Sequence, residues 1–276
     1  MDMEEYLGFS IVIANFNSGK FLEDALLSLF SQNYPNYELL IMDGGSTDNS
    51  VEIIQRYTDK ITYWQSKKDK GQSDAFNQGF AKATKEWLFW LNADDFLLED
   101  SLFRLNDKMH KHPGYRWYVF DECLVDRTGK CMRVSCFPQW NNFFMNKLGP
   151  MAPSATTVFH KSLFNESQGF DESLYWSMDY DLWIQFFKLG VKYYNIHEYI
   201  YAFRINENSK TMSEGLNTKR SEERIKQTAY LLKKNNMVVH KRWLPVWRLI
   251  KCFLVGFQRL WHNHLWKGKD LKWWKH

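Results

Sequence analysis

Small polar and acidic residues follow each of the first four apolar runs of the chain, and such residues can hold a metal ion and a phosphorylated ligand. The four groups are Asn15-Phe16-Asn17, Asp43-Gly44-Gly45-Ser46, Asp69-Lys70-Gly71-Gln72-Ser73-Asp74 and Asn92-Ala93-Asp94-Asp95. Any one group is more simply explained as a turn, because Gly, Asn, Asp and Ser are the usual turn residues. Four such groups at one edge of a sheet are harder to explain in that way, and we interpret them as a binding site.

The pair Asp94 and Asp95 is the most specific of these features. The two carboxylates directly follow the apolar run 87–91, so they would lie at the mouth of a buried strand. Like charges this close repel each other, and a cation relieves the repulsion. Mg²⁺ and Mn²⁺ suit such a place, because they bind one or two carboxylates together with substrate phosphates. The alternative is that the pair lies in the first turn of a helix from Phe96 onward, where the helix dipole stabilises negative charge.

A second acidic centre lies in the segment Ser177-Met178-Asp179-Tyr180-Asp181. The pattern predicts a helix over 178–188, on which Asp181 faces away from Asp179 because it comes two residues later. From the residues alone, the simpler interpretation is that both carboxylates stabilise the first turn of that helix.

The elements that must position these residues follow from the hydrophobic pattern. Apolar runs at 9–14, 37–42, 61–64 and 87–91 predict buried strands, and helical patterns lie between them. Further along, helices are predicted over 102–110, 178–188 and 219–235, and strands at 117–120, 130–134 and 155–159. Strands that alternate with helices at this spacing indicate βαβ units and an α/β fold with a mostly parallel, Rossmann-like sheet flanked by helices. Ligands of such sheets bind beyond the carboxyl ends of the strands, where the four polar groups lie.

These motifs resemble those of family 2 glycosyltransferases of the GT-A fold, as found in bacterial surface-polysaccharide synthesis. The matching stretches are 9–17, 41–50, 69–79, 91–95, 169–172 and 178–183, and together they span about residues 9–210, which is most of the chain. The resemblance implies a GT-A fold, a nucleotide-sugar donor of the UDP type, and an Mn²⁺ or Mg²⁺ ion.

The resemblance also implies a role for each matching residue. Asp43 would accept a hydrogen bond from the uracil N–H, and Asp179 would be the general base. Asp95 would be the main metal ligand, and Asp94 would contact the ribose or the metal. The residues expected to bind the nucleotide sugar are Asn15, Phe16, Asn17, Asp43, Gly44, Lys70, Gly71, Asp74, Asn92 and Asp94.

The chain departs from the family pattern at three positions. The family often has Asp where this chain has Asn92, and it has an acid where this chain has Met178. Asn206 takes the place of a histidine that, in many relatives, helps to hold the metal or the diphosphate. We therefore expect Arg204 or Lys210 to supply the phosphate contact in this segment. The alternative is that the segment is a mobile surface loop.

The last sixty residues are basic and rich in tryptophan. Residues 217–276 carry 15 Lys or Arg against 3 Asp or Glu, whereas residues 1–216 carry 21 against 29. Helical spacing over 247–266 gathers Arg248, Lys251 and Arg259 on one face, and burying each of them in a membrane-spanning helix would cost about 2.5–3.5 kcal/mol. An in-plane helix on an anionic membrane surface avoids that cost. The alternative is that the helix packs on the catalytic domain or on a second subunit.

These observations divide the chain into a catalytic domain, 1–216, and a helical, basic, membrane-associating extension, 217–276. Because the N-terminus shows no charged-then-apolar signal, we expect a cytoplasmic protein that is peripheral to the inner face of the plasma membrane. The four cysteines have no metal-ligand spacing, so reduced, buried thiols are expected.

The predicted function is an inverting transfer of a sugar from a nucleotide sugar to a saccharide or a lipid-linked acceptor in cell-surface polysaccharide synthesis, with no nucleic-acid partner. A nucleotidyltransferase is a poorer fit, because such enzymes usually place a Gly-rich basic loop after the first strand, and residues 14–20 contain one Gly and one Lys. The remaining alternative is a non-catalytic protein that binds nucleotide sugars or glycans at the membrane.

Overall fold

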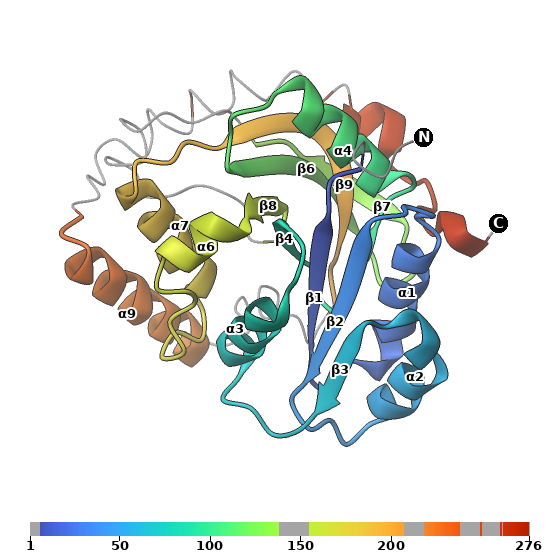
Figure 1. Cartoon of the computed structure of the whole chain (residues 1–276), viewed down its shortest axis with the longest axis horizontal. Helices are drawn as coiled ribbons and strands as arrows, with labels where there is room; N and C mark the ends of the chain where they lie inside the picture. The colour runs from blue at the N-terminus through green and yellow to red at the C-terminus, as the bar shows by residue number, and fades with distance from the viewer. Residues whose placement is uncertain are drawn as a thin grey trace.

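The structure is a computed structural model that describes residues 6–137, 155–206, 218–237 and 262–275, together with Leu249 and Leu260. Within these ranges a curled sheet of nine strands forms the centre of the molecule, with helices packed around it (Figure 1). Lys210 and most of the helix expected over 247–266 lie outside the described residues.

The first half of the chain forms the predicted βαβ units. Its elements are β1 (Phe9–Asn15), α1 (Gly19–Phe30), β2 (Tyr37–Asp43), α2 (Ser50–Arg56), β3 (Tyr63–Ser66), α3 (Gln72–Lys82) and β4 (Trp87–Trp90). The strands lie in the order β3-β2-β1-β4 and all their pairings are parallel. Figure 1 shows α1 and α2 on one side of these strands and α3 on the other. The helix α3 lies close to the sheet because Gly79 faces Val12, and a Cβ on Gly79 would come within 2.4 Å of a Val12 methyl group.

The second half makes the sheet mixed, so the prediction of a mostly parallel sheet holds only for β1 to β4. Its elements are β5 (Phe96–Leu97), α4 (Ser101–Lys111), β6 (Trp117–Val125), β7 (Cys131–Ser135), β8 (Thr157–His160), α6 (Lys161–Glu166), α7 (Met178–Lys188), β9 (Tyr194–Arg204) and α9 (Thr218–Lys234). The antiparallel pairs are β4–β8, β6–β8, β6–β7 and β5–β9, whereas β6–β9 is parallel. The physical reason for one of these pairs, β6–β7, is that the two strands form a hairpin, and hairpins pair antiparallel without a crossover helix.

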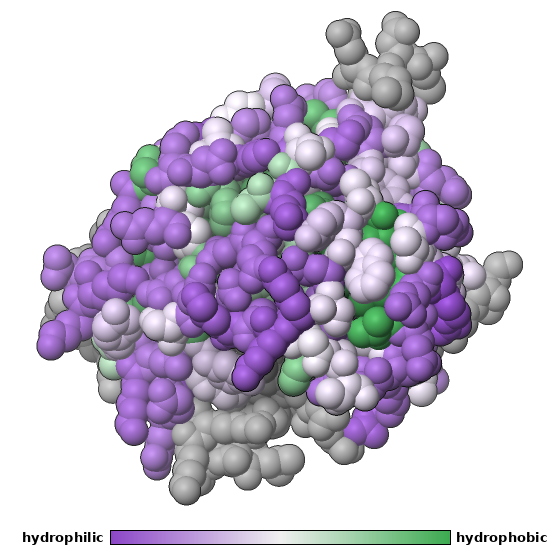
Figure 2. Space-filling model, turned by 60° about the horizontal axis from the view of Figure 1, so that its bottom comes forward, coloured by the Kyte–Doolittle hydropathy of each residue, from purple (hydrophilic) through white to green (hydrophobic). Residues whose placement is uncertain are grey.

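The strand register brings the predicted polar residues to one edge. Asn15 pairs with Asp43 across β1 and β2, and Asp43 pairs with Ser66 across β2 and β3. The carboxyl ends of these three strands point to the bottom of Figure 1. Figure 2 brings that side forward and shows a face that is mainly hydrophilic. An apolar core therefore ends at a polar rim where the ligand-binding residues are expected.

The end of the basic segment packs on the domain instead of standing apart from it. The backbone of Cys131 in β7 exchanges hydrogen bonds with Gly268 and Lys269. The ring of Trp274 meets Phe96 of β5 edge to face at 5.0 Å, and Trp273 Nε1 donates to the Leu97 carbonyl at 3.2 Å. Residues 262–275 thus pack on the domain, where Leu271, Trp266 and Trp274 join a small apolar cluster on β5, β6, β7 and β9. Whether the helix expected over 247–266 contacts a membrane or packs on protein stays a prediction, because most of it lies outside the described residues. The domain boundary at residue 217 stays a prediction.

None of the helices among the described residues combines the length and the apolar character that crossing a bilayer requires. The three cysteines in these ranges, Cys123, Cys131 and Cys136, are buried thiols that form no disulfide among the described residues, as expected.

Candidate active site

Asn15 and Asp43 lie side by side at the ends of β1 and β2. The side-chain amide of Asn15 and the hydroxyl of Ser46 both donate to Asp43 Oδ1, at 2.6 and 2.5 Å. Asp43 Oδ2 accepts from the Ser66 hydroxyl at 2.6 Å and from the backbone N–H groups of Gly45 and Ser46. Burial would raise the pKa of Asp43, which is 1% exposed, but these hydrogen bonds outweigh burial and hold the pKa below its ordinary value. Asp43 is therefore an ionised, buried anchor of the rim.

We expect Asp43→Asn to lower the free energy of unfolding at neutral pH by about 1–3 kcal/mol, because its amide NH₂ would face donors that need an acceptor. The lowered pKa means that Asp43 stabilises the fold above its unfolded pKa, near 3.9, and that this contribution is lost as the pH falls through the folded value. Urea unfolding should therefore show a difference between the two proteins that shrinks below about pH 4. Asp59→Asn, at an exposed carboxylate, is the matched control. A difference of the same size at neutral and acidic pH would contradict the prediction.

Phe16 and Asn17 form the turn after β1, and that turn is tied to the turn after β2. The backbone N–H of Asn17 donates to Ser46 Oγ at 2.8 Å, and Asn17 Oδ1 accepts from the Thr47 N–H at 2.8 Å. Asn17 has a φ of 50°, a left-handed conformation that asparagine tolerates well. The side chain of Phe16 is 63% exposed, so its ring lies on the surface, between Asn15 and Asn17 in the chain.

The loop between β3 and α3 adds further carboxylates to the same rim. Asp74 Oδ2 accepts from the Lys70 backbone N–H at 3.0 Å, and Asp69 Oδ1 accepts from the Gly71 N–H at 2.8 Å. A Cβ on Gly44 would lie 2.9 Å from Asp69 Oδ2, so glycine permits this close approach. Burial raises the pKa of Asp69, and the negative charge of Asp74 adds to the effect. Asp69 was not among the predicted site residues, although it lies within the motif.

Asp95 is fully enclosed by protein donors. Its Oδ2 accepts from Asn92 Nδ2 at 2.8 Å and from the Tyr201 hydroxyl at 2.7 Å, and its Oδ1 accepts from the Arg204 backbone N–H at 2.7 Å. The residue is 1% exposed. These contacts tie the turn after β4 to β9, and the expected role of Asp95 as main metal ligand stays a prediction.

Asp94 is the more accessible carboxylate of the pair. It is half-buried, and its Oδ2 accepts from Asn206 Nδ2 at 2.8 Å. Burial raises the pKa of both carboxyls, and for Asp95 the negative charge of Asp94 adds to the effect. The alternative that the pair opens a helix is wrong, because Phe96 and Leu97 form β5.

The residues fit a cation that arrives with a phosphorylated ligand. No cluster of three or more His, Cys, Asp or Glu side chains in the described part of the chain could hold a metal by itself. Mg²⁺ and Mn²⁺ do not need such a cluster, because they commonly use one or two carboxylates plus phosphates. Burial raises the pKa of Asp94 and so disfavours its negative charge, and a cation bound there would offset that penalty.

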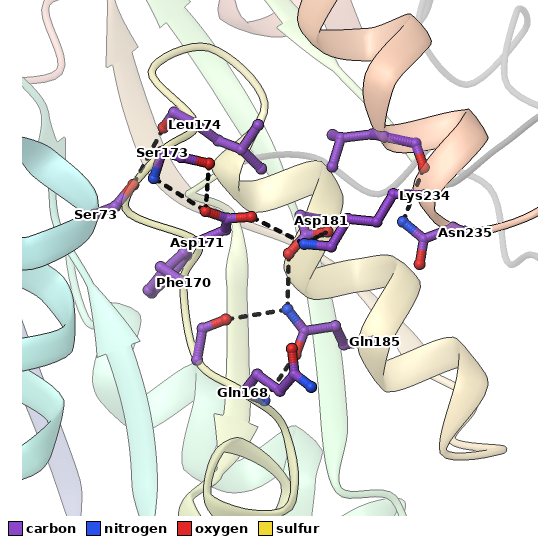
Figure 3. Close-up of polar contacts among 12 residues, drawn as sticks. Ser73, Gln168, Phe170, Asp171, Ser173, Leu174, Asp181, Gln185, Lys234 and Asn235 are labelled. Carbon is purple, nitrogen blue, oxygen red and sulfur yellow. Dashed lines mark hydrogen bonds and ion pairs between the residues drawn. The ribbon is translucent and has the colours of Figure 1, made fainter.

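The acidic residues at the start of α7 face different surroundings, as predicted. Asp181 is 1% exposed, and its Oδ2 accepts from Gln185 Nε2 at 2.8 Å (Figure 3). Lys234 of α9 lies 3.6 Å from Asp181 Oδ1 and forms an ion pair with Asp171 at 2.9 Å. Asp179 is half-buried, and its Oδ1 accepts from the Tyr180 N–H at 2.8 Å. Asp181 thus holds α7 and α9 together, which leaves Asp179 as the candidate base.

The first two residues of α3, Gln72 and Ser73, contact both the polar rim and the start of α7. Gln72 Nε2 donates to Asn92 Oδ1 at 3.4 Å, which is a long hydrogen bond. Ser73 Oγ lies 3.1 Å from Met178 Sδ, next to Asp179 in the chain. Met178, at the position where an acid was expected, is 6% exposed and packs on α3. The structure therefore brings both Asn92 and the start of α7 into contact with the first two residues of α3.

Two residues near the end of β9, Tyr201 and Arg204, were missed or wrongly interpreted from the sequence. Tyr201, which supports Asp95, has no local motif to reveal it. Arg204 is 1% exposed, its guanidinium lies over the Phe21 ring at 4.6 Å, and it pairs with Asp24 at 2.9 Å. The expectation that Arg204 contacts phosphate is therefore wrong for this structure, because the side chain is turned into the domain.

Comparisons with known proteins agree with this geometry. A family model described as glycosyl transferase family 2 matches residues 10–166. The chain is 28% identical over 224 residues to a Campylobacter jejuni protein named GalNAc(5)-diNAcBac-PP-undecaprenol beta-1,3-glucosyltransferase, a match that covers 76% of this chain and 69% of that protein.

Two solved structures share the fold. The crystal structure of S. aureus TarS 1–349 in complex with UDP-GlcNAc superposes with a TM-score of 0.60 at 20% identity, and covers 75% of this chain and 61% of that chain. A mannosyltransferase from Pyrobaculum calidifontis in complex with GDP-Man and Mn²⁺ has a TM-score of 0.55 at 14% identity, and covers 74% of this chain and 59% of that chain. At these identities the likeness shows the fold alone. The chain spans 67% of the length of the first curated relatives.

Proposed function

The chain belongs to glycosyl transferase family 2, and on that premise we propose that it moves a sugar from a UDP-sugar to a saccharide or lipid-linked acceptor with inversion at the anomeric carbon. The observation that carries the proposal is the polar rim at the carboxyl ends of the parallel strands. Asp43, the Asp69–Asp74 loop and Asp94 lie at the carboxyl ends of adjoining strands, and the loop contacts the start of α7. A donor could thus meet a base on a neighbouring element.

On the donor side, the nucleotide would lie along the ends of β1 and β2. Asp43 accepts five hydrogen bonds in this structure, so a uracil N–H would replace one of them, and the hydroxyls of Ser46 and Ser66 can rotate away. The exposed ring of Phe16 would cover one face of the base. Lys70 would leave its partner Glu172 to meet the diphosphate.

An Mn²⁺ or Mg²⁺ ion would be held by Asp94 together with the donor diphosphate, and when bound it would act as a Lewis acid that stabilises the leaving nucleotide. Asp95 would act indirectly, since its hydrogen bonds to Tyr201 and Arg204 hold in place the turn that carries Asp94. Asp179 would take the proton from the acceptor hydroxyl as that oxygen attacks the anomeric carbon.

The test is nucleotide release. The full-length protein is incubated with UDP- and GDP-sugars, with Mn²⁺, Mg²⁺ or a chelator, and with or without candidate acceptors. We expect release from at least one UDP-sugar that the chelator abolishes. Binding of a donor with no release under any condition would instead favour the non-catalytic alternative.

We also propose that the protein works at an anionic membrane surface. The support is the excess of Lys and Arg in residues 217–276 and the undecaprenol named for the Campylobacter relative. Removing residues 262–275 would expose the cluster that they cover, so charge substitutions are the better test. Replacing Lys241, Arg242, Arg248 and Lys251 by Gln should weaken binding to phosphatidylglycerol vesicles while leaving nucleotide release intact. Unchanged vesicle binding would contradict the proposal.

A further inference from the structure

Two adjacent aromatic residues, Tyr175 and Trp176, lie in the loop that leads into α7. Tyr175 is 56% exposed, and its ring meets the Trp176 ring edge to face, with centroids 4.9 Å apart. Among the described residues only Phe16, Tyr175 and Tyr230 are aromatic side chains with this degree of exposure. Single exposed apolar residues need no explanation. An adjacent aromatic pair that ends three residues before the candidate base does need an explanation.

The loop that carries the pair forms a short arch over the start of α3. The hydroxyl of Ser73 lies 3.3 Å from the Leu174 carbonyl, to which it donates, and 3.1 Å from Met178 Sδ. Figure 3 shows Ser73 and Leu174 approaching each other from the two elements. Because residues on both sides of Tyr175 and Trp176 contact Ser73, the backbone that carries the two rings lies next to the first turn of α3.

Further contacts hold the arch in place from its other side. The backbone N–H of Trp176 donates to Gln227 Oε1 of α9 at 2.9 Å. Asp171, at the start of the loop, accepts from the Ser173 backbone and hydroxyl and forms an ion pair with Lys234 (Figure 3). The rings are thus presented on a backbone tied to α3 and α9, and a fixed aromatic surface loses little entropy when a ligand packs on it.

We propose that Tyr175 and Trp176 are the specificity-determining platform for the acceptor sugar. A pyranose ring has one face of C–H groups that can pack on an aromatic ring, while its hydroxyls remain free to point toward neighbouring polar groups. A sugar on Tyr175 would lie between the donor loop and the start of α7, where its hydroxyl can reach Asp179. The inference rests on the proposed function and names one part of it, the class of acceptor: a saccharide with an exposed C–H face.

The experiment compares Tyr175→Ala, Tyr175→Phe and Tyr230→Ala with the wild-type full-length protein. Tyr230→Ala is the matched control, because Tyr230 is 52% exposed and lies on α9 instead of the arch. The probes are the methyl β-glycosides of glucose, galactose, N-acetylglucosamine and N-acetylgalactosamine. Their binding is measured by saturation-transfer NMR in the presence of UDP and Mn²⁺, and the KM for the donor is measured by nucleotide release.

We expect Tyr175→Ala to raise the Kd of the bound glycoside by about tenfold, as for the loss of one aromatic contact, while the donor KM changes by less than about twofold. Tyr175→Phe should keep the wild-type Kd, since the ring and not the hydroxyl forms the platform. Tyr230→Ala should match the wild type in both measurements. A general loss of folding would instead change donor and acceptor binding together.

Three results would overturn the platform. In the first, Tyr175→Ala binds the glycoside as tightly as the wild type does. In the second, the wild type binds none of the methyl glycosides. The variant could also lose binding to phosphatidylglycerol vesicles with glycoside binding unchanged, which would make the ring a membrane contact. If no donor releases nucleotide, the proposed function fails, but glycoside binding still tests the platform on its own.

Discussion

Asp94→Asn is expected to lower metal-dependent nucleotide release by about 10²- to 10³-fold, the loss typical when one group that stabilises transition-state charge is removed. The reason is the difference in exposure between the two neighbouring carboxylates. Asp94 is half-buried, whereas Asp95 accepts three hydrogen bonds and is 1% exposed. The measurement is the rate of nucleotide release as a function of Mn²⁺ concentration.

Asp95→Asn is the matched comparison, since it makes the same chemical change one residue away. Its amide NH₂ would face the Tyr201 hydroxyl or the Arg204 N–H, and leaving such a buried donor unsatisfied costs about 1–3 kcal/mol. We therefore expect Asp95→Asn to lower the free energy of unfolding. Asp94→Asn should not lower it, because Asp94 is half-buried and the amide oxygen of the replacement can keep the hydrogen bond from Asn206.

The pH dependence of stability follows from the raised pKa values of Asp94 and Asp95. A carboxyl whose pKa is higher in the folded state binds its proton more tightly there, so its contribution makes the fold less stable as the pH rises from the unfolded pKa to the folded one. Mn²⁺ with UDP should offset this loss in the wild type and raise its Tm. The assignment of Asp94 fails if Mn²⁺ with UDP raises the Tm of Asp94→Asn as much as that of the wild type.

Asp179→Asn is expected to slow transfer to an acceptor by about 10²- to 10⁴-fold, the usual contribution of a general base. The KM for the donor should change little, because the donor is held by the rim and not by α7. Product formation is measured with the donor and acceptor that the release assay identifies, and unfolding in urea checks that the fold is intact.

The control for Asp179 is Asp181→Asn on the same helix. Asp181 is buried beside Gln185 and Lys234, so its loss should reduce stability more than it reduces the rate of transfer in the protein that remains folded. If Asp181→Asn folds normally and loses more activity than Asp179→Asn, the roles of the two residues must be exchanged.

The amino-acid sequence by itself determined the first half of the fold and the edge of the sheet at which the candidate site residues meet. The strands β1 to β4, the helices between them and helix α7 fall where the pattern predicts them, because apolar periodicity and turn residues act within a few positions. The polar groups after those strands could be assigned to one edge, because parallel strands share an orientation. The pairing of β8 and β9 with β4, β5 and β6 could not be foreseen, since those partners are far apart in sequence.

Only the tertiary structure decided what each carboxylate of the site faces. Apart from Asn92, the partners that the structure gives Asp94 and Asp95 come from β9 and the residues just after it, more than one hundred positions away. No local pattern connects Asn206 to Asp94 or Tyr201 to Asp95. The same is true of Arg204, which pairs with Asp24 across the domain, and of the C-terminal segment that packs on β5. The physical reason is that propensity and periodicity are properties of neighbouring residues, whereas burial and hydrogen bonding depend on whichever distant segments meet when the chain is packed.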